Sequence, residues 1–126
     1  MLNLNSLMIG TTQPKVLADF YAKVLDKKPD MEQDGWYGFQ AGSCFITIGE
    51  HSEAKDKAKE PFRLMFNLET SEVKKEFDRI KEIEDIDVIK EPYDAGQGMM
   101  IATFADPDGN YFQLMPPWED DKEKDD

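Results

Sequence analysis

The sequence predicts an α+β fold built from two tandem βαβββ modules. A strand followed by an amphipathic helix occurs near the start of the chain and again after residue 61, and further strands follow each helix. Three pairs of like residues recur at one common spacing: Leu7 and Leu64, Val16 and Val73, and Phe20 and Phe77. An internal repeat of strand, helix and three strands is the simplest explanation of this recurrence.

The strongest local signal is Asp106-Pro107-Asp108-Gly109, which lies between two apolar, aromatic-rich runs. Proline presets the φ angle that a type I turn needs, and glycine can adopt the positive φ that follows it. Each aspartate can accept a hydrogen bond from a nearby backbone N–H group. The segment therefore predicts a β-hairpin with a bulged turn. A calcium site is disfavoured, because no loop of regularly spaced acids surrounds the turn.

In the first module, over residues 1–50, residues 4–9 alternate as a strand does. A helix is expected to begin at Pro14, with Thr12 or Gln13 near its N-cap, and to end near residues 26–27. Strands are expected over 36–40 and 43–48, joined by a turn at residues 41–42. Apolar residues spaced by three and four give the helix one broad stripe: Val16, Leu17, Phe20, Tyr21, Val24 and Leu25.

Residues 51–60 are charged and lack periodicity, which predicts a surface connector before a second module over 61–118. This module should begin with a strand over 62–68, followed by a helix whose apolar stripe includes Val73, Phe77 and Ile80. A short strand should end near Pro92, and a glycine-bracketed turn at 96–98 should precede the hairpin. Beyond the hairpin turn, Tyr111, Gln113 and Met115 should point to one face and the residues between them to the other.

Composition restricts the class of function. A formal net charge of −12 argues against nucleic-acid binding, because few basic residues could cluster around phosphates. We expect neither a membrane span nor a signal peptide, because no apolar run approaches the roughly 20 residues that a span needs. A single cysteine, Cys44, fits a reducing cytoplasm. The charged residues 119–126 are expected to form a disordered, acidic tail.

These features resemble the vicinal oxygen chelate superfamily, which includes glyoxalase I, extradiol dioxygenases, and the fosfomycin and bleomycin resistance proteins. The resemblance is carried by Phe20-Tyr21-x-x-Val24-Leu25 and by Asp106-Pro107-Asp108-Gly109-Asn110, and it covers residues 4–117. It implies one glyoxalase-like domain over 1–118, in which the two modules form a half-barrel cleft. It also implies a homodimer.

In metal-dependent members of this superfamily, histidines and glutamates on the inward faces of central strands hold a divalent ion. The resemblance places those four positions on Ser6, Ile46, Arg63 and Gln113. The Ser6 hydroxyl and the Gln113 amide are weak ligands. The Ile46 side chain offers no donor atom, and the Arg63 guanidinium repels the ion. We therefore expect no metal and no other cofactor at this site.

Arg63 leaves two interpretations open. It can pair with a nearby carboxylate or lie at the exposed end of its strand, or its planar fork can bind an anionic or carbonyl-bearing ligand. His51, beside Glu50 and Glu53, is interpreted as a surface histidine, and Cys44 as a buried structural thiol.

The sequence thus predicts a cytoplasmic protein, resembling the bleomycin-resistance branch, that binds a small molecule without the family's metal site. The alternative is a lyase, isomerase or dioxygenase that uses a relocated metal or none; a third possibility is an interaction module with a vestigial cleft. Whether the protein is an enzyme stays open. The expected partners are a small-molecule ligand and a second copy of the chain. The predicted ligand-binding residues are Ser6, Met8, Trp36, Ile46, Arg63, Met65, Met100, Gln113 and Met115.

Overall fold

A computed structural model describes residues 1–118, and the predicted acidic tail lies outside the described residues. The chain divides into two compact units. Unit 1 comprises Met1–Lys59 together with Asp106–Gly109, and unit 2 comprises Glu60–Ala105 and the chain from Asn110 onward. Within the described residues, neither helix is long and apolar enough to cross a membrane.

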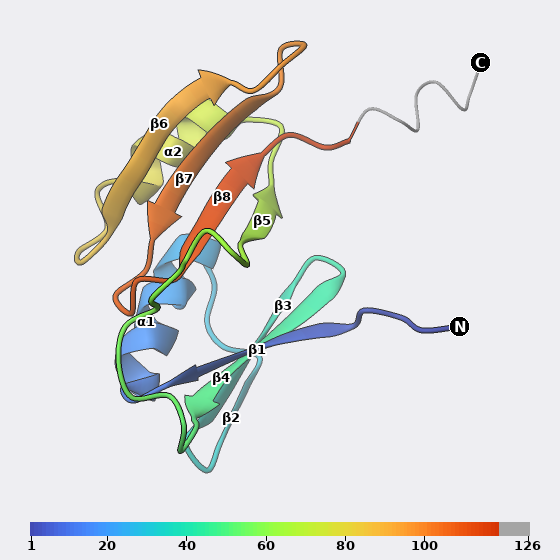
Figure 1. Ribbon diagram of the computed structural model, residues 1–126. Coiled ribbons are helices and arrows are strands. Elements are labelled where there is room, and N and C mark those ends of the chain that lie inside the picture. The colour runs from blue at the N-terminus through green and yellow to red at the C-terminus, as the bar shows by residue number, and fades with distance from the viewer. Residues whose placement is uncertain (119–126) are drawn as a thin grey trace. The chain divides into compact units, whose positions relative to one another are not determined.

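Unit 1 is a four-stranded sheet with one helix, α1 (Figure 1). Its elements are β1 (Ser6–Thr11), α1 (Pro14–Leu25), β2 (Met31–Gln33), β3 (Trp36–Ala41) and β4 (Cys44–Glu50). The strand order is β1-β4-β3-β2, with β1 parallel to β4 and the other pairs antiparallel. The helix packs against β1, β3 and β4 and so covers one face of this sheet, and we call the opposite face the open face.

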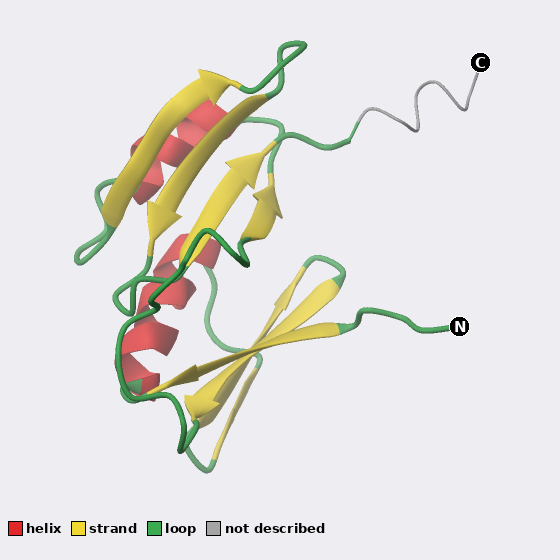
Figure 2. Ribbon diagram, viewed as in Figure 1, coloured by secondary structure: helices red, strands yellow, loops and turns green. Residues whose placement is uncertain are grey.

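Unit 2 repeats this plan with the helix α2, as the colouring by secondary structure shows (Figure 2). Its elements are β5 (Phe66–Glu69), α2 (Val73–Ile80), β6 (Asp87–Asp94), β7 (Met100–Ala105) and β8 (Tyr111–Met115). The strand order is β5-β8-β7-β6, and only β5 and β8 are parallel. The same order and the same single parallel pair in both units confirm the predicted α+β fold of two βαβββ modules.

Several strand boundaries differ from the sequence prediction, and one of them is the end of β6, which continues past Pro92 to Asp94. The first strand begins at Ser6, two residues late, and β5 begins only at Phe66. The short strand β2 was not placed at all. The sequence feature that indicates β2 is Asp34-Gly35, a dipeptide that suits a tight hairpin between β2 and β3. Both residues have positive φ angles, of 52° and 83°.

The helical stripes form the core of each unit. Leu17, Phe20, Tyr21 and Val24 of α1 are buried, as predicted, whereas Val16 is 45% exposed and lies outside the buried stripe. In unit 2, all three predicted positions of α2 are buried. Phe77 stacks on Phe104 of β7, which in turn contacts Phe112 of β8, with ring centroids 5.3 and 5.6 Å apart. Each module therefore builds its core between its helix and one face of its sheet.

The hairpin turn 106–109 connects two strands of unit 2 but packs within unit 1. The backbone N–H of Gly109 donates to the carbonyl of Asp106, and Gly109 has a φ of 83°, as the turn prediction required. Asp106 is buried, and its Oδ2 accepts a 2.6 Å hydrogen bond from Tyr21 Oη of α1. Gln13 Nε2 donates to Asp108 Oδ1. The backbone N–H of Ala58 donates to the backbone carbonyl of Asp108. The turn thus joins the start and middle of α1 to the connector.

We expect the Tyr21–Asp106 contact to make stability depend on pH in the alkaline range. Burial, followed by the nearby Asp106 carboxylate, raises the pKa of Tyr21 well above its ordinary value of 10.0. Above about pH 10, tyrosine in the unfolded chain loses its proton while folded Tyr21 keeps it, so the free energy of unfolding falls as the pH rises. Urea unfolding of the wild type and of Tyr21→Phe at pH 8 to 11 measures this. The wild type should lose more stability than the variant over this interval, and equal losses would contradict the assignment.

Candidate functional site

The open face of the unit 1 sheet contains three of the predicted ligand-binding residues. Paired residues in neighbouring strands point to the same face, so the register identifies this face. Ser6 pairs with Phe45, and Met8 pairs with Thr47. Trp36, which precedes the Tyr37–Ile48 pair, lies on the same face. Ser6 is exposed and Met8 is 57% exposed, which leaves both available to a ligand.

Two half-buried aromatic rings cover glycines on this open face. A Cβ atom built on Gly49 would lie only 2.2 Å from atoms of the Trp36 indole. A Cβ built on Gly38 would lie 2.4 Å from Cζ of Phe45. The two glycines therefore let the rings lie directly on the backbone of a neighbouring strand. The result is an aromatic surface beside Met8.

Ile46 requires a correction. The family resemblance placed it on an inward face together with Ser6, but its partner in the sheet is Leu7, and its side chain is only 3% exposed. Phe39 pairs with it on the other side and is also buried. Ile46 consequently belongs to the helix-covered core of unit 1. The side chains of β4 on the open face are those of Phe45 and Thr47, which the sequence prediction did not include.

The face of the unit 2 sheet opposite α2 contains Gln113 and Met115. Gln113 pairs with Thr103 of β7 and with Asn67 of β5. Its Nε2 donates a 3.1 Å hydrogen bond to Thr103 Oγ1, so the amide is held in place within the sheet. Met115 lies two residues further along the same face and is buried. The predicted alternation of β8 is confirmed, because Phe112 and Leu114 lie in the core.

Arg63 and Met65 lie outside β5. The predicted strand over 62–68 is shorter than expected, which removes Arg63 from any strand face and contradicts its predicted inward position. Its Nη2 forms a 2.9 Å ion pair with Glu60 Oε1, and both side chains are more than 70% exposed. The first interpretation of Arg63, pairing with a nearby carboxylate, is therefore confirmed. Met65 directly precedes β5 and is half-buried.

The four residues that the family resemblance predicted at metal positions do not suit a divalent ion. Ile46 faces the core, Arg63 is a cation in a turn, and Gln113 donates its amide to Thr103. Ser6 alone offers one neutral hydroxyl, which is a weak ligand for transition metals. Among residues 1–118, no three histidine, cysteine, aspartate or glutamate side chains gather where they could hold a metal ion.

His51 and Cys44 occupy ordinary positions. His51 Nδ1 accepts a 3.1 Å hydrogen bond from the N–H of Glu53, and the residue is exposed, as the surface interpretation predicted. Its Cβ lies 2.8 Å from where a Cβ of Gly10 would be, so the connector packs closely on β1. Cys44 is a half-buried free thiol, rather than the fully buried one expected.

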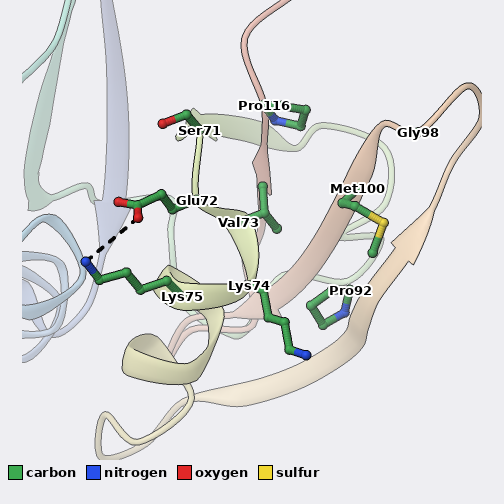
Figure 3. Close-up of a pocket in the computed structure, with 9 residues that line it drawn as sticks. All are labelled: Ser71, Glu72, Val73, Lys74, Lys75, Pro92, Gly98, Met100 and Pro116. Atoms are coloured by element: carbon green, nitrogen blue, oxygen red, sulfur yellow. Dashed lines mark ion pairs between the residues drawn. The ribbon is translucent and has the colours of Figure 1, made fainter.

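Met100 lies in a different place from the other predicted residues. It pairs with Asp94 at the start of β7, on the helix-covered side of the unit 2 sheet that also contains Ala102 and Phe104. There it lines a cavity of about 420 Å³ beside the first turn of α2 (Figure 3). The complete lining comprises Ser71, Glu72, Val73, Lys74, Lys75, Pro92, Gly98, Met100 and Pro116.

The sequence prediction missed several residues of these surfaces. Gly38 and Gly49 inside strand patterns were a usable signal, because a glycine in a strand often marks the close approach of another group. Phe45 and Thr47 could have been included only with the β1–β4 register known. No signal pointed to Lys74 or Pro116, because residues distant in sequence form the cavity.

Comparison with known proteins agrees with the two-module architecture. The family model for the Glyoxalase/Bleomycin resistance protein/Dioxygenase superfamily matches residues 3–114. The chain belongs to this superfamily. No curated protein matches the sequence.

Several solved structures have the same fold. A structure described as a conserved domain protein has a TM-score of 0.78 and 21% identity, and the match covers 93% of this chain and all of that one. A glyoxalase-related enzyme from Fulvimarina pelagi has a TM-score of 0.73 and 12% identity, with 93% and 89% covered. A glyoxalase/bleomycin resistance protein/dioxygenase family enzyme from Burkholderia phytofirmans PsJN has a TM-score of 0.71 and 20% identity, with 91% and 98% covered. At these identities the likeness establishes the fold.

Proposed function

We propose that the protein binds a small molecule with a flat, apolar body on the open face of the unit 1 sheet, without a metal ion. The observation that carries this proposal is the pair of aromatic rings over Gly49 and Gly38, beside the exposed Met8. Aromatic faces stack on flat ligands, and methionine adapts its shape to irregular ones. Ser6 and Thr47 add hydroxyl groups that can orient a polar substituent of the ligand.

The donor set supports the metal-independent part of the proposal. Of the four predicted metal positions, Ile46 and Arg63 lie off the inward strand faces, and Ser6 and Gln113 offer a hydroxyl and an amide, which do not form a site for zinc, iron or manganese. Binding energy at the open face would instead come from apolar contact and from stacking. A ligand of this kind is sequestered rather than converted, as in the bleomycin-resistance proteins that the sequence resembles.

Replacing Trp36 with alanine should weaken such a ligand about tenfold, because the indole is the largest apolar surface on this face. A thermal-shift screen of planar aromatic compounds identifies a ligand, and isothermal titration calorimetry then measures its affinity for wild type and Trp36→Ala. Trp118→Ala is the matched control, since Trp118 lies after β8 and is 64% exposed. Equal affinity of all three proteins would place the ligand elsewhere.

Metal analysis distinguishes this function from the enzymatic alternative. The purified protein should contain no stoichiometric transition metal, and chelation should leave ligand affinity unchanged. A tightly bound metal, together with lyase, isomerase or dioxygenase activity that chelation abolishes, would overturn metal-independent binding. It would favour the enzymatic alternative, and the Fulvimarina and Burkholderia proteins are both described as enzymes.

A further inference from the structure

The cavity in unit 2 has the composition of a site for a small anion with an apolar body. One wall consists of the first turn of α2, and the opposite wall comes from β6 and β7 (Figure 3). Val73, Pro92, Met100 and Pro116 supply apolar surface from four separate segments. Its volume of about 420 Å³ lies in the range that small-molecule sites occupy. The cavity is thus large enough for a ligand and mostly apolar.

The charged groups around the cavity leave one cation available. Glu72 Oε1 and Lys75 Nζ are 3.8 Å apart, so these two charges largely offset each other. Asp94, near the cavity at the end of β6, accepts hydrogen bonds from the N–H groups of Gly96 and Gly98 at 2.7 and 3.1 Å. Within residues 1–118, Lys74 has no ion pair, and its side chain extends from α2 along the cavity (Figure 3). The positively charged Lys74 side chain therefore lies at an apolar cavity in a strongly acidic chain.

The backbone adds hydrogen-bond donors at the same place. Glu72 is the N-cap of α2, and its side chain makes no capping hydrogen bond. The first N–H groups of a helix have no partner within the helix, and the positive end of the helix dipole favours an anion there. The N–H groups of Val73, Lys74 and Lys75 belong to this turn.

We propose that this cavity binds a small organic carboxylate, with the carboxylate at Lys74 and the first turn of α2 and the apolar body against Met100 and the two prolines. The site is separate from the proposed ligand face of unit 1, and neither proposal depends on the other. It also lies on the helix-covered side of its sheet, opposite the strand face that contains Gln113.

Benzoate and benzamide provide a matched pair of probes, because they share an apolar ring and differ in charge. Titration of the full chain with each probe is followed by ¹⁵N–¹H NMR. Benzoate should shift the amide signals of Val73, Lys74 and Lys75 saturably, and benzamide should bind at least about fivefold more weakly. Absence of saturable shifts at these amides, or equal affinity for both probes, would overturn the proposal.

Two lysine variants separate a local contact from the general effect of charge. Lys74→Gln should weaken benzoate about fivefold or more, and Lys74→Arg should restore most of the affinity. Lys55→Gln removes the same charge from an exposed position in unit 1 and should leave the affinity within about twofold. Equal effects of Lys74→Gln and Lys55→Gln would mean that the anion senses only net charge, and the proposed site would be wrong.

Discussion

Replacing Phe104 with alanine should lower the free energy of unfolding by about 3–5 kcal/mol, as truncation of a fully buried aromatic ring typically does. Phe104 is completely buried near the end of β7. Its ring lies between Phe77 of α2 and Phe112 of β8, so it connects the helix to the sheet. The variant loses the transfer free energy of the ring and leaves a cavity that rigid strands cannot close. Urea unfolding followed by circular dichroism measures the change.

Phe62→Ala is the control for this prediction, because it makes the same chemical change at a ring that is 67% exposed. Phe62 keeps one edge-to-face contact with Tyr111, at a centroid distance of 4.7 Å. Phe62→Ala should therefore lower the free energy of unfolding by only about 0.5–1.5 kcal/mol. Similar losses for Phe62→Ala and Phe104→Ala would show that Phe104 is not the centre of the unit 2 core.

Asp106→Asn should lower the free energy of unfolding by about 2–3 kcal/mol, because it removes a charged acceptor from a buried site. The two carboxylate oxygens accept hydrogen bonds from Tyr21 Oη and from the N–H of Asp108, at 2.6 and 2.9 Å. Asparagine has only one acceptor oxygen, so its NH₂ group must face one of these donors. Measurement of Tyr21→Phe and of the double variant completes a cycle, which should give a coupling of about 1 kcal/mol or more.

Asp108→Asn is the matched control in the same turn. Asp108 is only partly buried, and its Oδ1 accepts from the neutral Gln13 Nε2 at 2.8 Å. An asparagine can keep that acceptor, so the loss should stay below about 1 kcal/mol. A loss as large as that of Asp106→Asn would indicate that the turn is sensitive to any charge change, rather than to the buried Tyr21–Asp106 contact.

Most of the fold could be predicted from local patterns. The stripe of α1, the Asp-Pro-Asp-Gly turn and the alternation of β8 each rest on residues close together in sequence. The recurrence of the first module in the second then gave the architecture. The strand that was missed and the strand that was most misplaced are the short ones: β2 has three residues and β5 has four. Few alternating residues mark such strands, so their limits depend on pairing with strands from elsewhere in the chain.

The candidate sites could be predicted only in part. Ser6, Met8 and Trp36 were expected at the ligand face and share the open face of one sheet. Ile46 and Arg63 were misplaced, since an alignment of motifs fixes neither the strand register nor the first residue of a strand. A shift of one residue moves a side chain to the opposite face, and this is the error at Ile46. The Lys74 cavity could not be anticipated, because α2, β6, β7 and the chain after β8 meet there only in the folded protein.

The sequence by itself determined the two-module repeat, the hairpin turn and the alternation of β8, because all of these are properties of residue identity and local spacing. Tertiary structure decided which residues share a face, where Arg63 pairs, and that the turn of unit 2's hairpin packs within unit 1. It also placed Lys74 beside an apolar cavity. These features depend on register and on contacts between distant segments, and periodicity along the chain cannot specify either of them.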